Sequence, residues 1–183
     1  MLEERIVRFC APTIMGNKTG SLFNACHEDP KTLCRDVVEA RKSLSRFGID
    51  IRLFFKEDKP PLVYVYRVKA LERDLADPDC QDFLRQHGYE KFDPKSALSQ
   101  LSVRLRHYTE FPHEIGLFLS YPLSDVKNFV QFGSTCSKMR GYWCVYDNEE
   151  QAKKCFADYD RCRQECLLRY QQGQRLEDFA RAM

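Results

Sequence analysis

The sequence predicts a mixed α/β (α+β) fold in which a sheet of about five strands, including a β-hairpin, is flanked by helices. Two β-type runs lie close together in the chain, and apolar residues recur at helical spacing elsewhere. Of the 183 residues, 43% are hydrophobic and 13% aromatic, which is typical of a packed globule. No linker or repeat divides the chain, so residues 1–183 are expected to form a single domain with a loose C-terminal tail over 173–183.

The N-terminal part is expected to begin with a short strand over residues 5–10. A long loop is expected over residues 11–28, because proline, glycine and asparagine interrupt any period there. Asp29 and Pro30 are the residue types of a helix N-cap and first helical position, and Gly48 is typical of the end of that helix. A loop as long as residues 11–28 in a compact domain is typical of a functional segment.

Two β runs, over residues 50–56 and 62–68, are expected to pair as an antiparallel hairpin. Strand alternation places Tyr64 and Tyr66 on one face and Val63, Val65 and Arg67 on the other. Helical spacing of apolar residues follows. The helices predicted from it cover residues 69–76, 78–87 and 94–108.

The segment from Phe111 to Pro122 places His113 and Glu114 directly before an apolar run. Residues 115–119 are expected to form a buried strand, with the two ionisable groups at its start. Neighbouring residues on a strand point to opposite faces, so one of the two is expected to be buried and the other exposed.

The last third is expected to be mainly helical. Asn148 is a suitable N-cap for the final helix, and acidic residues follow it in the first turn. The predicted elements are a helix over 122–132, a polar loop over 133–140, a strand over 142–146 and a long helix over 148–172.

Charge and composition exclude several functional classes. The 29 basic and 27 acidic residues give a net charge of +2, so no nucleic-acid partner is expected. No apolar run approaches the roughly 20 residues that span a bilayer, and the N-terminus lacks the pattern of a signal peptide. We therefore expect a cytoplasmic protein with no membrane partner. Its nine cysteines are expected to be free and mostly buried. The oligomeric state is not encoded in these features.

Several motifs together resemble an uncharacterised bacterial family, a domain of unknown function known mainly from anaerobic, clostridia-like bacteria. The resemblance extends from about residue 6 to about residue 168 and implies no established activity, substrate or cofactor. Phe9 and Ser120 depart from the family pattern, where a histidine and a glycine often stand. The motifs are Cys10-Ala-Pro-Thr-Ile-Met-Gly, Ser21-Leu-Phe, Phe111-Pro-His-Glu-Ile-Gly-Leu-Phe-Leu and Gly141-Tyr-Trp-Cys-Val-Tyr.

Cys10, His113 and Asp147 are the candidate catalytic residues. A thiol near the N-terminus of a helical turn has a lowered pKa, His113 is a candidate base, and Asp147 is a candidate to orient the imidazole. This order is similar to that of papain-like cysteine enzymes. The alternative is that Cys10 is a buried residue at a strand end and that His113 caps a loop by hydrogen bonding.

The candidate ligand-binding residues are Thr13, Lys18 and Glu114. The segment Gly16-Asn-Lys-Thr-Gly-Ser21 departs from the phosphate-loop pattern, but its backbone amides and Lys18 are able to hold an anion. The alternative is a plain loop with turn residues. A ligand site would use the loop over residues 10–28 and the start of the run at 115–119.

The cysteines suggest two further clusters. Cys26 and His27 lie in the long loop and approach Cys10 if that loop folds back. Cys155, Cys162 and Cys166 share one helical stripe, which suits a soft metal or a core face. The first and last of these are about 16 Å apart along a helix axis, too far to share one ion, whereas Cys162 and Cys166 are one turn apart and close enough to share one. The core face is the favoured interpretation, and no metal ligand is assigned.

Two functional classes remain from the sequence. The first is a small-molecule or cofactor-binding module in anaerobic redox or metal homeostasis, with the cofactor unidentified. The second is a thiol-dependent hydrolase or transferase that uses Cys10 and His113. Whether the protein is an enzyme depends on what surrounds the Cys10 thiol.

Overall fold

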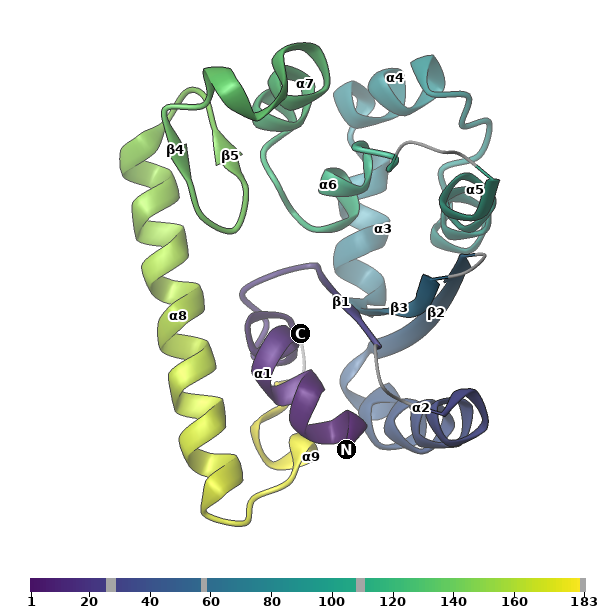
Figure 1. The fold of residues 1–183 in the computed structure, drawn as a ribbon, viewed down its shortest axis with the longest axis vertical. Helices are drawn as coiled ribbons and strands as arrows, with labels where there is room; N and C mark the ends of the chain where they lie inside the picture. Colours follow the sequence, from purple (N-terminus) through teal and green to yellow (C-terminus); the bar gives the residue numbers. More distant parts are fainter. Residues whose placement is uncertain (26–28, 57–58, 108–110, 182–183) are drawn as a thin grey trace.

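The computed structural model describes residues 1–25, 29–56, 59–107 and 111–181. It is a mixed α/β structure, as predicted, with five strands in the described residues (Figure 1). These strands form two sheets, one of three strands in the order β1-β3-β2 and one of two strands, β4-β5. The expectation of a single five-stranded sheet is therefore wrong.

The elements have the following bounds. The helices are α1 (Leu2–Ile14), α2 (Pro30–Leu44), α3 (Val68–Ala76), α4 (Pro78–Gln86), α5 (Pro94–His107), α6 (Ile115–Phe118), α7 (Leu123–Phe132), α8 (Glu149–Gln171) and α9 (Leu176–Phe179). The strands are β1 (Gly20–Asn24), β2 (Ile49–Lys56), β3 (Lys59–Arg67), β4 (Met139–Arg140) and β5 (Cys144–Val145), and short 3-10 turns cover Ser45–Phe47 and Gly133–Cys136.

The first element is a helix, so the prediction of a strand over residues 5–10 is wrong. Six apolar side chains along α1 are buried at spacings of one, three and four residues, which mark one face of a helix. Two acidic residues in its first turn also favour the helix N-terminus. A six-residue window is too short to show this period. The buried apolar residues are Leu2, Ile6, Val7, Cys10, Ala11 and Ile14.

The predicted loop over residues 11–28 is correspondingly wrong in extent. It contains the last turn of α1 and the whole of β1, and only residues 15–19 connect the two. Gly16, at φ +92°, ends the helix: the Asn17 N–H donates to the Pro12 carbonyl at 2.8 Å and the Gly16 N–H to the Thr13 carbonyl at 3.2 Å. This pair of bonds is the Schellman arrangement, so the connection is tightly folded.

The three-stranded sheet separates two hydrophobic cores. β3 is the central strand and pairs antiparallel with β1 and β2, which confirms the predicted hairpin. Val63 and Val65 face the core shared with α1, α2 and the C-terminal part of α8, whereas Tyr64 and Tyr66 face α3, α4 and α5. Figure 1 shows α8 running beside α1 at the edge of the molecule.

The predicted helix starts at Pro30 and directly after Asn148 are confirmed, as is the end of the first of these helices before Gly48. The Asp29 carboxylate accepts from the Thr32 N–H at 2.9 Å, and Pro30 is the first helical residue. Gly48 is left-handed at φ +70° and follows the 3-10 turn after α2. The Asn148 side chain accepts from the Gln151 N–H at 3.0 Å and begins α8.

Residues 115–119 form the one-turn helix α6 rather than the predicted strand. A Cβ atom on Gly116 would lie 2.7 Å from Val126, so α6 packs closely on α7. The Tyr121 N–H then donates back to the Gly116 carbonyl at 2.9 Å, which turns the chain. A short apolar run does not distinguish a buried strand from a buried helical turn, and here the packing decides.

The predicted strand over 142–146 is reduced to β5, which pairs with β4 inside the predicted polar loop. The buried Asp125 carboxylate of α7 holds this hairpin. It accepts from the indole N–H of Trp143 at 2.7 Å and from the backbone N–H of Tyr146 at 2.9 Å. The hairpin packs in turn on the first half of α8 through a third core cluster that contains Tyr159.

No helix in the described part of the chain combines the length and apolar composition needed to cross a bilayer.

Candidate functional site

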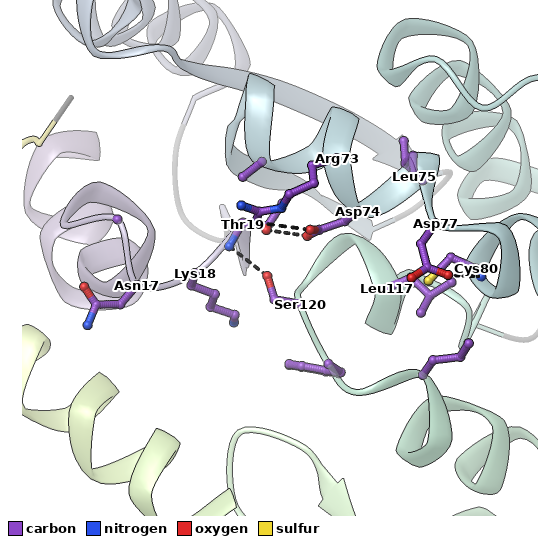
Figure 2. A pocket seen from close by; sticks show the side chains of 14 residues that line it. Asn17, Lys18, Thr19, Arg73, Asp74, Leu75, Asp77, Cys80, Leu117 and Ser120 are labelled. Atoms are coloured by element: carbon purple, nitrogen blue, oxygen red, sulfur yellow. Dashed lines mark hydrogen bonds and ion pairs between the residues drawn. The ribbon is translucent and has the colours of Figure 1, made fainter. Parts of the chain in front are cut away.

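A cavity of about 500 Å³ lies beside the turn between α1 and β1. Its walls come from residues 16–19, from α3, from the start of α4 and from the segment that joins α6 to α7 (Figure 2). The lining includes the charged side chains of Lys18, Arg73 and Asp74. It therefore combines apolar surface with a few polar groups, as small-molecule sites do.

Thr19 ties three of these elements together. Its backbone N–H donates to the Ser120 hydroxyl at 2.7 Å, and its own hydroxyl donates to the Asp74 carboxylate (Figure 2). Ser120 has φ +58°, a left-handed conformation that side chains other than glycine rarely adopt. The strained backbone at Ser120 thus places its hydroxyl at the turn that carries Lys18.

Gly20 allows the sheet to approach α6. A Cβ atom at this position would lie 2.5 Å from the Phe118 carbonyl oxygen and from the Tyr64 ring. The Tyr64 hydroxyl donates to that same carbonyl at 2.6 Å, so the contact is a buried polar one. This close approach brings the turn at residues 16–19 next to the segment after α6, and both line the cavity.

Lys18 is the most unusual side chain at the cavity. It is 8% exposed, and its ammonium lies over three tyrosine rings, at 5.2 Å from the Tyr121 centroid, 5.9 Å from Tyr142 and 5.6 Å from Tyr159. Among the described residues it has no carboxylate partner and no hydrogen bond. The ring faces supply cation–π attraction, which is stronger where water is excluded.

Burial lowers the pKa of Lys18 from 10.5 to about 8, because the charged form loses its hydration. The nearby thiols of Cys10 and Cys155 partly oppose this shift. Near neutral pH the side chain is therefore a cation that releases its proton far more readily than a surface lysine does.

The Lys18 nitrogen is not fully sealed from solvent. Within the described chain, the one side-chain nitrogen or oxygen that is both sealed from solvent and without a hydrogen bond is Nη1 of Arg67. The Lys18 nitrogen also lacks a hydrogen bond to any of these described residues. Because it is not among the sealed atoms, solvent reaches it. Figure 2 shows the Lys18 side chain between its own turn and Ser120, among the residues that line the cavity.

The three candidate catalytic residues lie in different surroundings. Cys10 is in the middle of α1, fully buried, so the premise of a thiol near a helix N-terminus is incorrect. Burial raises the pKa of the Cys10 thiol far above its usual range. His113 is exposed and packs edge-on against Phe129 at 4.8 Å, while Asp147 is exposed beyond the β4–β5 hairpin. No contact in the described residues joins these side chains.

His113 lines a second cavity, of about 420 Å³, together with aromatic side chains of α7 and of the β4–β5 hairpin. Tyr121 lines both cavities and stands between them. Cys10 lines neither of the two. The structure therefore separates the thiol from the imidazole that the sequence paired with it.

Of the candidate ligand-binding residues, Lys18 lines the cavity beside the α1–β1 turn, whereas Thr13 and Glu114 are engaged elsewhere. The Thr13 hydroxyl is buried against that of Ser21 at 2.8 Å. Glu114 is 1% exposed, forms an ion pair with Arg104 and accepts from the Tyr89 hydroxyl at 3.2 Å. Glu114 is thus buried and His113 exposed, as expected, although both lie in a turn.

The eight cysteines in the described residues are all free. Cys162 and Cys166 belong to the core between α1 and α8, and no group of three or more potential metal ligands occurs in the described ranges. Cys26 and His27, the other suggested cluster, lie outside the described residues.

The sequence did not reveal the tyrosines around Lys18 or the role of Ser120. The tyrosines come from the segment after α6, the turn of the β4–β5 hairpin and α8, so no local pattern joins them. Ser120 did carry a signal, because it stands where the resembled family often has glycine. The left-handed φ at this position accounts for a glycine there.

Comparison with known proteins places the chain in one family. A profile described as "Protein of unknown function (DUF3793)" matches residues 6–180, which is nearly the whole chain. No curated protein and no solved structure matches it. All of the motifs that suggested a domain of unknown function lie within the matched range, and the chain belongs to the DUF3793 family.

Proposed function

We propose that the protein is a small-molecule-binding module whose ligand occupies the cavity beside Lys18 and carries an anionic group. The observation that supports this most directly is the buried Lys18 ammonium, which has open space beside it and no counterion among the described residues. A buried cation without a partner is costly, and an anionic ligand would offset that cost. The anaerobic redox or metal-homeostasis setting expected from the sequence stays a prediction.

The acidic residues of the cavity are already engaged. The two oxygens of Asp74 accept from the Thr19 hydroxyl and from Arg73, the latter at 3.4 Å. One oxygen of Asp77 accepts from the N–H groups of Asp79 and Cys80 and caps α4. Lys18 therefore remains the charge in the wall that a ligand is best placed to neutralise.

The alternative of a thiol-dependent enzyme has less support. A nucleophilic cysteine needs an accessible thiolate. Cys10 instead lies in the hydrophobic core between α1 and its neighbours, and burial raises the pKa of its thiol. The free state of the described cysteines suits the cytoplasmic location that we infer for the protein.

Ligand binding is measurable by titration calorimetry against a panel of inorganic phosphate, glyoxylate, pyruvate and 2-oxoglutarate, with glycerol as an uncharged reference. We expect at least one anion to bind, glycerol not to bind, and Lys18→Met to weaken binding about tenfold or more, which corresponds to about 1.4 kcal/mol. Lys69→Met is the matched control, because Lys69 is an exposed lysine of α3 outside the cavity lining.

A second variant tests the cavity itself. Leu123 lines the cavity at the start of α7 and is half-buried, so Leu123→Trp places a bulky indole ring in the cavity. We expect this variant to lose binding while it retains the far-ultraviolet circular dichroism of the wild type. Binding that is equal in the wild type, Lys18→Met and Leu123→Trp would contradict the proposed site, as would the failure of every anion to bind.

A further inference from the structure

The geometry around Lys18 points to a covalent role for its amine: we propose that Lys18 forms a reversible imine with a small 2-oxo acid bound in the cavity. This inference rests on the proposed function, because it concerns the same cavity and the same side chain. It goes further, since it assigns a chemical step to the amine and a chemical class to the ligand.

The surroundings of Lys18 are those of a reactive lysine. The side chain is desolvated among three tyrosine rings, it has no ion pair in the described residues that would hold its proton, and Lys18 lines the cavity. Desolvation in an apolar pocket is a general way to activate a lysine amine for attack on a carbonyl. A buried lysine with a purely structural role would be stabilised by a carboxylate partner.

The lowered pKa determines what fraction of the Lys18 side chains carries the reactive neutral amine. With a pKa of about 8, roughly one tenth of the Lys18 side chains carry a neutral amine at pH 7. An exposed lysine with an ordinary pKa has roughly 300-fold less. Lys18 is therefore expected to be the preferred site of imine formation, even though its access is restricted to the cavity.

The step is balanced without an oxidant or a further reactant. The Lys18 nitrogen lone pair attacks the carbonyl carbon of the 2-oxo acid, and a new C–N bond forms while the C=O π electrons move to the oxygen. Two protons pass from the nitrogen to the oxygen, and the C–O bond then breaks to release one water while the nitrogen lone pair forms the second C–N bond of the imine. The products are the imine and water, and hydrolysis reverses the reaction.

The choice of a 2-oxo acid follows from the second cation of the cavity. Arg73 lines the cavity from α3, and its one ion pair among the described residues is that with Asp74 at 3.4 Å. A guanidinium has five N–H donors, so Arg73 retains donors for a carboxylate. A ligand with a carbonyl and an adjacent carboxylate matches an amine and a guanidinium in one cavity.

Reductive trapping tests the imine. The full-length protein is incubated with glyoxylate, pyruvate or 2-oxoglutarate and with sodium cyanoborohydride, and the adducts are located by peptide mass mapping. We expect one dominant adduct on Lys18, at least about tenfold above any exposed lysine, and its loss in Lys18→Arg. Leu123→Trp should reduce the adduct strongly, because it fills the cavity that delivers the ligand.

Trapping and binding together distinguish this inference from the proposed function. If the panel binds by calorimetry but no adduct forms on Lys18, or adducts spread evenly over exposed lysines, the imine is overturned and the binding site stands. If neither binding nor an adduct is found, both are overturned. An adduct on Lys18 that Leu123→Trp leaves unchanged contradicts delivery through this cavity.

The pH dependence of trapping gives a further check. The titratable groups that face Lys18 are the thiols of Cys10 from α1 and Cys155 from α8, together with the hydroxyls of the three surrounding tyrosines. Burial raises the pKa of Cys10 and of all three tyrosines, so they stay protonated while Lys18 titrates. The trapping rate should rise with a midpoint near pH 8. A midpoint near that of an exposed lysine would overturn the assignment.

Discussion

Two buried cations lie close to the end of α1, and they are held in opposite ways. Arg67 is 2% exposed, and its guanidinium donates to the Thr13 carbonyl at 2.6 Å and to the Ile14 carbonyl at 2.5 Å. Lys18, four residues after Ile14, is 8% exposed and contacts aromatic faces instead. Arg67 adds charge-assisted hydrogen bonds to two carbonyls that also accept backbone N–H groups, whereas Lys18 meets only tyrosine ring faces in the described chain.

The difference separates a structural role from a functional one. Arg67 comes from the central strand and binds the last turn of α1, so it joins the sheet to the helix that precedes the cavity. Lys18 is carried by the turn that this anchor fixes. Each prediction below changes one side of this pair, and the expected effects decrease from the first to the last.

The largest effect is expected for Arg67→Met. The substitution removes two charge-assisted hydrogen bonds and leaves two buried carbonyls without these donors, which we expect to cost about 3 kcal/mol of unfolding free energy. Urea denaturation measures this cost, with Lys69→Met as the control for loss of one positive charge. A cost below about 1 kcal/mol would show that the guanidinium does not anchor α1.

The opposite sign is expected for Lys18→Met at pH 7. The folded wild type must bury a charged amine there, whereas methionine places an apolar group among the tyrosines, so the variant should be the more stable protein. The pKa of Lys18 is lowered on folding, so the unfolded chain binds more protons between about pH 8 and 10.5. Wild-type stability from this group therefore rises with pH in that window.

Measurement at two pH values isolates this contribution. Between pH 7 and pH 9.5 the advantage of Lys18→Met over the wild type should shrink by about 2 kcal/mol. The difference between the two proteins cancels the thiols and tyrosines that titrate in both. An advantage that stays constant, or a variant that is less stable at pH 7, would mean that Lys18 is not desolvated as described.

The sequence revealed those parts of the fold that depend on neighbouring residues. Asp29 with Pro30 and Asn148 mark helix starts through side chains that cap the next few N–H groups, and alternation along residues 62–68 marks β3. Residues 5–10 were misread because β-branched residues suit strands, although the full period of α1 extends to Ile14. The run at 115–119 was misread because the close contact of Gly116 with Val126 is tertiary.

The candidate site likewise has features that depend on neighbouring residues and features that depend on tertiary packing. Lys18 was predicted as a ligand-binding residue from the turn residues around it, and it does line the cavity. Its tyrosine surroundings depend on how α8 and the β4–β5 hairpin pack, so no local pattern showed them. Cys10 and His113 were paired by chain order alone, and chain order does not determine which core a side chain enters.

The smallest effect is expected at Ser120, where the backbone and the side chain act in opposite directions. Ser120→Ala keeps the left-handed φ of +58° but loses the hydroxyl that accepts from the Thr19 N–H, so it should cost about 1 kcal/mol. Ser120→Gly loses the same bond but relieves a backbone strain of about 1 kcal/mol, so it should be nearly neutral.

Urea denaturation of both variants compares these two terms. Because Thr19 follows Lys18 directly, both variants should also weaken ligand binding, by less than Lys18→Met does. A Ser120→Ala variant as stable as the wild type would show that the hydroxyl does not hold the turn. A Ser120→Gly variant that is more stable than Ser120→Ala would explain how a family that often has glycine here keeps the same backbone. This chain uses serine, whose hydroxyl fixes the turn beside the buried lysine.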